Sequence, residues 1–481
     1  MKHIHILGIC GTFMGALALL AREKGYKVTG SDQNVYPPMS SYLESQGIEL
    51  ISGYEYDIES FKPDQVIVGN TMRRGMPIVE YLLNSELEYF SGPEWLYQEI
   101  LKDKKVIAIA GTHGKTTTTS MVIKLMDDAG LNPSFLVGGI TQDFGVSSRL
   151  TDSEYFVIEA DEYDTAFFDK RSKFMHYHPD ILVINNLEFD HADIFNSIED
   201  IYRQFHHLMR LLPGKSTVIY PKPDAHIDKL LAMGCWSERC PLQAEHGLDI
   251  KPLLQDYSQF EIIDHNRTLK INWALLGEHN AKNALSAYAI LKTLGVSLDK
   301  VTESFKNFKG VKRRLECIAQ NDHYAIYDDF AHHPTAVAQT LRAIKARAGE
   351  KERVVAILEP RSNTMKMGAQ ESALINALHI ADEVCFYQNS VMQWQAASYA
   401  KDNFLVFDQV ANIVEHFKQS QPERFTHYVI MSNGAFDGLH QQLGALARRG
   451  IETEKVRNFS RDEILPATNV ALGSYFFPAK K

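Results

Sequence analysis

The sequence predicts an α/β protein of three domains. Rossmann-like domains stand at both ends, and between them lies a domain like that of the P-loop ATPases, with a mostly parallel sheet. A length of 481 residues with 45% hydrophobic side chains is enough to bury more than one core. A buried strand followed by a glycine-rich turn and a helix occurs near residue 3 and again near residue 106, and strands alternate with helical stretches after residue 310. We expect domains at residues 1–102, 103–310 and 311–481.

The first domain begins with a nucleotide-binding type of βαβ pattern. A strand at residues 3–9 leads into a turn with three glycines at residues 8–15, then a helix, and then a strand at residues 26–30 that is followed by Asp32. This order is typical of sites where a helix N-terminus receives a phosphate. A purely structural βαβ unit has the same spacing, so both interpretations stay open. The loop Gly69-Asn70-Thr71 follows another strand and offers a further place for a ligand.

The second domain begins with a phosphate-binding pattern. The buried strand 106–109 is followed by Gly111-Thr112-His113-Gly114, and then Lys115 opens a helix. Glycines let backbone N–H groups surround phosphate oxygens, Lys115 adds a full positive charge, and the Thr116 hydroxyl is placed to hold Mg²⁺. The general pattern has glycine where this chain has Ile109. The alternative is a glycine- and threonine-rich turn without a ligand.

A carboxylate and an imidazole follow two further strands of the same domain. The strand at residues 155–160 ends near Glu159, and the strand at residues 181–185 leads to His191. The carboxyl ends of parallel strands meet at one edge of a sheet, where open α/β sheets collect ligands. Either residue alone is typical of a helix cap or a solvated loop, but beside Lys115 the pair indicates Mg²⁺ ligands.

Polar residues further along the chain suggest the rest of a site. Asn280 and Asn283 lie three residues apart in the first turn of a helix, where they either cap the helix or contact a nucleotide base; propensity alone favours capping. In the third domain, three strands end in the polar clusters 328–334, 359–364 and 432–434. These clusters predict the second half of a site.

Composition excludes several classes of function. A net charge of −10 and a pI near 6.0 argue against nucleic acid or an anionic membrane as a partner. The sequence has neither a secretory signal pattern nor a long apolar run, so we expect a cytoplasmic protein. Its five cysteines are scattered without a C-x-x-C pair, which argues against a structural metal site.

Six motifs in order, AGTHGKTTT, EADEYD, NNLEFDH, GEHNAKN, VKRRLE and DDFAHHP, resemble the Mur ligases, which form amide bonds in peptidoglycan synthesis with ATP. The resemblance covers essentially the whole chain. HILGICGTFMG, SD and HHP are similar to the branch that handles UDP-N-acetylmuramate. Within that branch, EPRSNTMKMG and VGNTMRRG resemble members that attach the tripeptide L-Ala-γ-D-Glu-meso-diaminopimelate recovered from old cell wall. The alternative is addition of L-alanine in de novo synthesis.

The resemblance implies a mechanism, two cofactors and a set of site residues. The lactoyl carboxylate of UDP-N-acetylmuramate attacks the γ-phosphate of ATP, and the peptide amine then attacks the acyl phosphate, with Mg²⁺ as the metal. Catalytic roles fall to Lys115, Glu159 and His191, and metal ligation to Thr116, Glu159 and His191. The residues expected to bind ATP are Gly111, Thr112, His113, Gly114, Lys115, Thr116, Thr117, Asn280, Asn283, Arg314 and Asp329. Those expected to bind the UDP-sugar are Gly8, Gly11, Thr12, Met14, Ser31, Asp32 and Asn70, and those expected to bind the peptide are Arg361, Ser362 and Asn363.

Two features of the implied site depend on how the domains are arranged in space. Arg314 and Asp329 belong to the third domain, so domain closure becomes part of catalysis. Several Mur ligases carry a carbamylated lysine about fifteen residues after the histidine motif, but this chain has no lysine between His191 and Lys215. How a second metal site is completed is therefore left open. Arg361 suits a peptide carboxylate because guanidinium makes two parallel hydrogen bonds, although a surface arginine is the alternative.

Two other classes of function are alternatives to the ligase. A nucleotide-dependent dehydrogenase joined to a P-loop module is disfavoured because Cys10 and Phe13 occupy glycine positions of the dinucleotide fingerprint. A P-loop switch or motor would hydrolyse ATP without any UDP-sugar. Binding of NAD(P)H would indicate the dehydrogenase. ATP hydrolysis that does not require a UDP-sugar would indicate the switch or motor.

Overall fold

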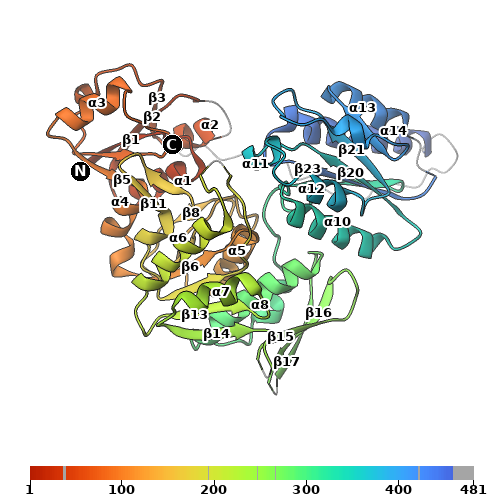
Figure 1. The fold of residues 1–481 in the computed structure, drawn as a ribbon, viewed down its shortest axis with the longest axis horizontal. Helices are drawn as coiled ribbons and strands as arrows, with labels where there is room; N and C mark the ends of the chain where they lie inside the picture. Colours follow the sequence, from red (N-terminus) through yellow and green to blue (C-terminus); the bar gives the residue numbers. More distant parts are fainter. Residues whose placement is uncertain (36–38, 193, 246, 266, 421–422, 459–481) are drawn as a thin grey trace, which may run out of the picture.

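Three α/β units make up the chain. A computed structural model describes residues 1–35, 39–192, 194–245, 247–265, 267–420 and 423–458. Figure 1 shows the first and central units stacked together, with the third unit beside them. The three-domain α/β fold with mostly parallel sheets that the sequence predicts is confirmed. Within the described residues, no helix combines the length and apolar character needed to cross a bilayer.

The first unit is a five-stranded parallel sheet in the order β3-β2-β1-β4-β5. Its strands are β1 His3–Leu7, β2 Lys27–Asp32, β3 Glu49–Ser52, β4 Gln65–Val68 and β5 Glu88–Ser91. Its helices are α1 Thr12–Glu23, α2 Met39–Ser45, α3 Pro77–Asn84 and α4 Gly92–Glu99. β1 ends earlier than the sequence predicts, because Gly8 takes a φ of +83° and starts the turn.

The central unit has a seven-stranded sheet in the order β14-β13-β12-β6-β9-β7-β8, parallel except for the β7–β8 pair. Its strands are β6 Lys105–Ala110, β7 Ser134–Leu136, β8 Ser148–Arg149, β9 Tyr155–Glu159, β12 Ile181–Ile184, β13 Thr217–Pro221 and β14 Glu238–Leu242. Its helices are α5 Lys115–Asp128, α6 Ile198–Leu211, α7 Ala225–Met233, α8 Glu278–Thr293 and α9 Val301–Lys306.

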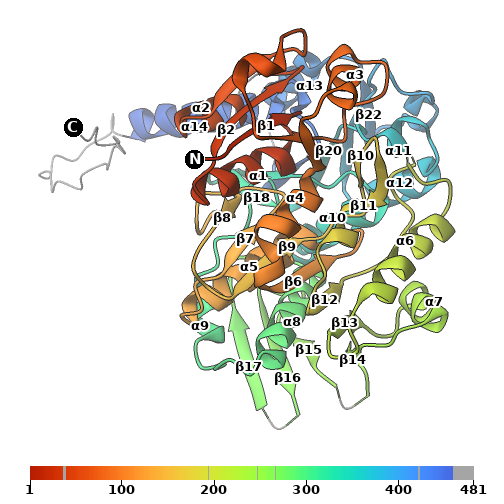
Figure 2. The ribbon, with the colours of Figure 1, turned by 90° about the vertical axis from the view of Figure 1, so that its left-hand side faces the viewer.

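Two small antiparallel sheets accompany the central sheet. One pairs β10 Asp164–Ala166 with β11 Asp169–Ser172. The other joins β15 Asp249–Pro252, β16 Gln259–Asp264 and β17 Arg267–Asn272. Figure 2 shows these last three strands projecting from the lower end of the central unit, away from the first unit.

Helix α5 is buried on almost every side. Its residues from Thr116 to Ile123 are all buried, because α5 packs on the sheet and α8 and α9 pack against α5. The buried hydroxyls stay satisfied within the helix: Thr119 donates to the Lys115 carbonyl at 2.8 Å, and Ser120 donates to the Thr116 carbonyl at 2.8 Å. The first turn of α5 is therefore rigidly held.

The third unit is a six-stranded sheet in the order β18-β19-β23-β20-β21-β22, in which only the edge strand β18 is antiparallel. Its strands are β18 Glu316–Gln320, β19 Tyr324–Asp329, β20 Arg353–Leu358, β21 Glu383–Tyr387, β22 Phe404–Phe407 and β23 Thr426–Met431. Its helices are α10 Pro334–Ala348, α11 Asn363–Lys366, α12 Glu371–Leu378, α13 Val410–Gln419 and α14 Leu439–Asn458. Because β23 lies between β19 and β20, the three predicted polar clusters meet at one edge.

Candidate active site

The turn between β6 and α5 depends on two glycines. Gly111 has a φ of +128°, and a Cβ there would lie 3.0 Å from the carbonyl oxygen of Asn186. Gly114 has a φ of +79°, and a Cβ there would lie 2.6 Å from the side-chain oxygen of Asn283. Only glycine fits both the backbone angles and the space. The turn is fixed further by the His113 N–H, which donates to the side-chain oxygen of Asn186 at 2.8 Å.

Lys115 lies directly beneath this turn, with its side chain 11% exposed. Its Nζ donates to the Gly111 carbonyl at 2.6 Å and to the Thr112 carbonyl at 3.3 Å, and it lies 3.4 Å from Oε2 of Glu162. Burial by itself lowers the pKa of the Lys115 ammonium, but the nearby carboxylates, with Glu162 first, outweigh burial and raise that pKa above its ordinary value. Lys115 therefore keeps its positive charge beside the turn.

The Thr116 hydroxyl and the Glu159 carboxylate lie together, as the sequence predicts for groups at the carboxyl edge of the parallel sheet. Thr116 donates to Oε1 of Glu159 at 3.1 Å, and Oε2 of Glu159 accepts from the Gly138 N–H at 2.7 Å. Arg314 of the third unit donates to the same Thr116 oxygen at 3.2 Å. Two oxygen ligands of the kind that Mg²⁺ prefers are thus adjacent at the first turn of α5.

His191 and Lys115 share one carboxylate. His191 Nε2 lies 3.1 Å from Oε1 of Glu162, whose other oxygen faces Lys115. Burial by itself raises the pKa of Glu162, but Lys115 and then His191 outweigh it and lower that pKa to about 2. The sequence analysis assigned no role to Glu162. The E-A-D-E-Y-D motif contains it, but the motif cannot tell which of its acidic side chains points inward.

Asn280 is not the cap of α8. The N-cap is Gly277, whose φ of +93° and ψ of 145° break the helix before Glu278. The Asn280 amide donates back to the Leu276 carbonyl at 2.8 Å, and the Asn283 amide donates to the Asn280 oxygen at 3.4 Å. Both asparagines are buried and face a cavity. The preference for capping was wrong because it ignored the glycine in front of the helix.

One cavity of about 240 Å³ collects most of the residues predicted for ATP and metal. Of the predicted set only Gly111 lies outside its lining. Arg314 and Asp329 reach this cavity from the third unit, so the two units meet at the P-loop. The lining also contains His332 and His333 of the predicted polar cluster 328–334, together with Asp161, Tyr163 and Asp190, for which the sequence indicates no role.

Asp329 gives this junction a pH dependence. Burial raises the pKa of Asp329 to about 6, although the Ala331 N–H and Arg314 oppose the effect. A carboxyl with a native pKa above its unfolded value adds stability at low pH and loses it as the pH rises through about 6. We expect the Tm of the wild type, relative to Asp329→Asn, to rise by about 1–2 °C from pH 7 to pH 5. Thermal denaturation followed by circular dichroism measures this, and a constant difference across pH would contradict it.

A second cavity, of about 770 Å³, connects the first unit to Glu159. Six of the residues predicted for the UDP-sugar line it: Gly8, Gly11, Thr12, Met14, Asp32 and Asn70. Asp32 also fixes the glycine turn, because its Oδ2 accepts from the Cys10 N–H at 2.9 Å. Ser31 does not line this cavity: its side chain is fully buried and accepts a hydrogen bond from the Tyr56 hydroxyl at 2.7 Å.

The residues predicted for the peptide lie at the start of α11. The Arg361 side chain is 46% exposed and its Nη1 lies 3.8 Å from Oε1 of Glu359. The Ser362 hydroxyl accepts from the Met365 N–H at 3.3 Å and thereby caps α11. These two residues and Asn363 are not among the residues that line the two cavities above. The same segment still borders the central unit, because Thr364 accepts from the Ala192 N–H at 3.1 Å.

All three units of the chain match domains described for one family. Residues 3–104 match the catalytic domain of the Mur ligase family, residues 109–291 match the Mur ligase middle domain, and residues 313–434 match the glutamate ligase domain of the Mur ligases. These matches follow the three sheets in order along the chain.

Several ligases of this family are similar to the chain over most of its length. It is 47% identical to the UDP-N-acetylmuramate–L-alanyl-γ-D-glutamyl-meso-2,6-diaminoheptandioate ligase of Escherichia coli, over 92% of this chain and 97% of that protein. The crystal structure of a murein peptide ligase from Psychrobacter arcticus has 41% identity and a TM-score of 0.71, covering 93% of this chain and 99% of that one. A UDP-N-acetylmuramate–L-alanine ligase of Syntrophomonas wolfei is 32% identical over 80% of this chain and 82% of that protein.

Proposed function

The chain belongs to the Mur ligase family, and we propose that it joins UDP-N-acetylmuramate to the tripeptide L-Ala-γ-D-Glu-meso-diaminopimelate with consumption of ATP. The observation that carries this proposal is the 47% identity, over almost the full length of both chains, to a ligase with this peptide in its name. Identity to an L-alanine ligase is 32% over a shorter stretch. We propose that the reaction belongs to peptidoglycan recycling and takes place in the cytoplasm, where the sequence leads us to expect the protein.

The reaction needs two displacements and no protein nucleophile. An oxygen of the lactoyl carboxylate attacks the γ-phosphorus, the bond to the β-γ bridging oxygen breaks, and ADP leaves. The peptide amine then attacks the acyl carbon, phosphate leaves, and the nitrogen loses a proton. Catalysis is therefore a matter of position and charge, and the buried ammonium of Lys115 lies beside the turn that receives the phosphates.

Residues at the P-loop fit a magnesium ion. The Thr116 hydroxyl and Glu159 carboxylate oxygens lie 3.1 Å apart, and hard oxygen ligands of this kind suit Mg²⁺. His191 is proposed as a ligand of a second ion. When bound, Mg²⁺ offsets negative charge on the phosphates. In addition, Arg314 orients the first turn of α5 from the third unit, since it donates to Thr116.

We divide the work between three domains, at residues 1–102, 103–310 and 311–481. The first binds the UDP moiety in the cavity of about 770 Å³, the second binds ATP at the P-loop, and the third receives the peptide. That cavity reaches from Gly11 to Glu159, which supports a path for the sugar from the first domain to the phosphate site. Asn280 and Asn283 are proposed to contact the nucleotide base.

Phosphate release with two amines tests the proposed function. The full-length protein is mixed with ATP, Mg²⁺ and UDP-N-acetylmuramate, and either the tripeptide or L-alanine is added. Release that requires both the UDP-sugar and the tripeptide is expected. Faster release with L-alanine would assign the enzyme to de novo synthesis, and release without the UDP-sugar would contradict the ligase reaction for this substrate.

Arg361 is the candidate for recognition of a peptide carboxylate. Its guanidinium is half exposed and packs on Gly434, where a Cβ would lie 2.2 Å from the arginine Cδ. We expect Arg361→Ala to raise KM for the tripeptide by about 10–100-fold, the size of a charge-assisted hydrogen bond, with KM for ATP unchanged. Lys418→Ala, which removes an exposed charge from α13, is the matched control. A KM for the tripeptide within twofold of the wild type would make Arg361 a surface residue only.

A further inference from the structure

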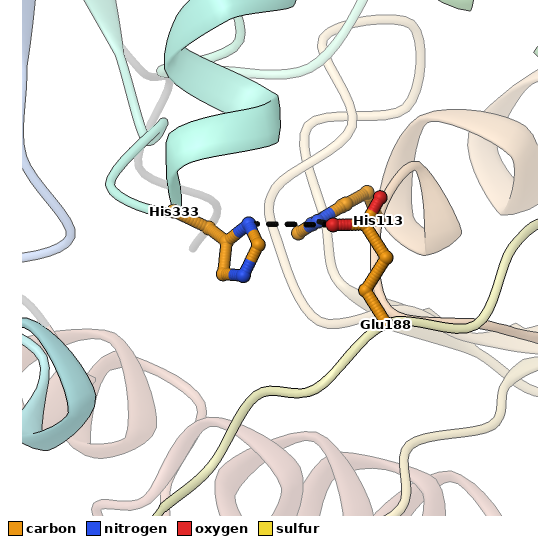
Figure 3. Close-up of side chains that lie close together, drawn as sticks. All are labelled: His113, Glu188 and His333. Carbon is orange, nitrogen blue, oxygen red and sulfur yellow. Dashed lines mark ion pairs between the residues drawn. The ribbon is translucent and has the colours of Figure 1, made fainter. Parts of the chain in front are cut away.

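Three side chains with metal-binding atoms converge where the central and third units meet (Figure 3). His113 lies in the P-loop turn, Glu188 follows β12, and His333 caps the N-terminus of α10. In Figure 3 the imidazole of His333 faces the other two side chains from the opposite side of the gap. The group thus joins two segments of the central unit to one of the third.

The geometry is close to that of a coordinated metal. Oε2 of Glu188 lies 3.7 Å from His113 Nε2 and 3.7 Å from His333 Nδ1, and the two rings are 4.7 Å apart. All three ligand atoms lie within 4.8 Å of one another. Around a tetrahedral zinc with bonds of about 2.0–2.2 Å, ligand atoms are about 3.3 Å apart. Each of the two distances from Glu188 to a histidine nitrogen exceeds this value by only a few tenths of an ångström.

The nitrogen of His113 gives an independent indication. Its Nε2 is buried and has no hydrogen-bond partner among the described residues. At 3.7 Å, the Glu188 oxygen is too far away for a hydrogen bond. A buried polar atom without a partner is uncommon and often marks a missing water or ion. The orphan atom points toward the same carboxylate as His333 does.

The other two ligands are prepared in different ways. His333 Nε2 contacts the Phe189 carbonyl at 3.3 Å, which favours a proton on Nε2 and leaves the Nδ1 lone pair toward Glu188. The partner of that lone pair is the Thr335 N–H, at a long 3.3 Å. Glu188 accepts from the Thr335 hydroxyl at 2.6 Å, which orients the carboxylate.

We propose that His113, Glu188 and His333 form a binding site for a zinc-class transition-metal cation that links the central unit to the third. Two imidazoles and one carboxylate are a common zinc ligand set and leave a fourth position open to water or a ligand. The set differs from the oxygen-rich group of Thr116 and Glu159, where magnesium is expected. The inference is independent of which amine the enzyme uses.

Cobalt titration of the metal-stripped, full-length protein tests the site. Co²⁺ replaces zinc and absorbs strongly in the visible range when it is four-coordinate, and excess Mg²⁺ keeps Co²⁺ from the oxygen ligands. We expect one equivalent to produce these bands in the wild type. His333→Asn keeps a good N-cap for α10, and Glu188→Gln keeps the shape of the carboxylate. Each variant is expected to weaken Co²⁺ binding by about 100-fold or more.

A second cluster of the chain supplies the control. Glu383, Cys385 and His416 also place ligand atoms within 4.8 Å of one another, but Arg353 contacts Glu383 at 2.5 Å and opposes a cation. His416→Asn is therefore expected to bind Co²⁺ as the wild type does. Absence of the bands in the wild type, their loss in His416→Asn, or their persistence in both folded variants at the first cluster would overturn the proposal.

Discussion

Replacing Lys115 by alanine is expected to lower kcat by about 1,000-fold or more. The ammonium is enclosed, stays charged, and lies against the turn that we propose receives the phosphates. In a water-poor site a fixed charge stabilises the transferring phosphoryl group far more than it would in water, and loss of even one hydrogen-bond donor costs about 10²–10³-fold. Steady-state kinetics with all three substrates saturating measures the effect.

The matched control is Lys124→Ala on the same helix. Lys124 lies further along α5 and pairs with Asp128 at 2.7 Å, away from the turn. We expect its kcat to stay within about twofold of the wild type, since such partly exposed pairs contribute little. Equal losses in the two variants would mean that damage to α5, and not a missing charge at the phosphates, explains the result for Lys115.

Glu162→Gln is expected to lower kcat by about 100-fold, the second largest effect. Glu162 is buried and holds Lys115 with one oxygen and His191 with the other. A neutral amide keeps the shape of the side chain but removes the charge that fixes both groups, so each loses its orientation toward the substrates. We expect KM for ATP to change much less than kcat, because the backbone of the P-loop is intact.

Glu154→Gln is the control for Glu162. Glu154 precedes β9 and forms an exposed ion pair with Lys105 at 2.8 Å. Its kcat should equal that of the wild type. If Glu162→Gln retains more than a third of the wild-type kcat with an unchanged Tm, the carboxylate does not position Lys115 and His191.

The elements of the fold were predictable because their causes are local. The β6 strand, the glycine turn and the start of α5 follow from apolar runs, positive φ angles and helix propensity within a short window. The proximity of Thr116 and Glu159 follows from the parallel pairing of β6 with β9, which brings the turn after β6 and the end of β9 to one edge of the sheet. Local patterns therefore gave the architecture and the centre of the site.

Other features depend on partners far away in the sequence. Ser31 turns away from the cavity proposed for UDP because its hydroxyl accepts a hydrogen bond from Tyr56, which lies in a later loop. Glu162 turns inward because Lys115 and His191, from two other segments, each contact one of its carboxylate oxygens. The metal-binding group of Figure 3 joins two units, so neither unit's sequence indicates it alone. Tertiary packing determines the orientation of Ser31, the orientation of Glu162 and the group of Figure 3. Such packing cannot be predicted from local patterns in one sequence.

A competition between the two amines tests the central claim most directly. Equal concentrations of L-alanine and L-Ala-γ-D-Glu-meso-diaminopimelate are offered to the enzyme with ATP, Mg²⁺ and UDP-N-acetylmuramate, and the products are identified by mass spectrometry. The account predicts that the UDP-N-acetylmuramoyl tripeptide is the main product. UDP-N-acetylmuramoyl-L-alanine as the main product would contradict it and assign the enzyme to the first amino-acid addition.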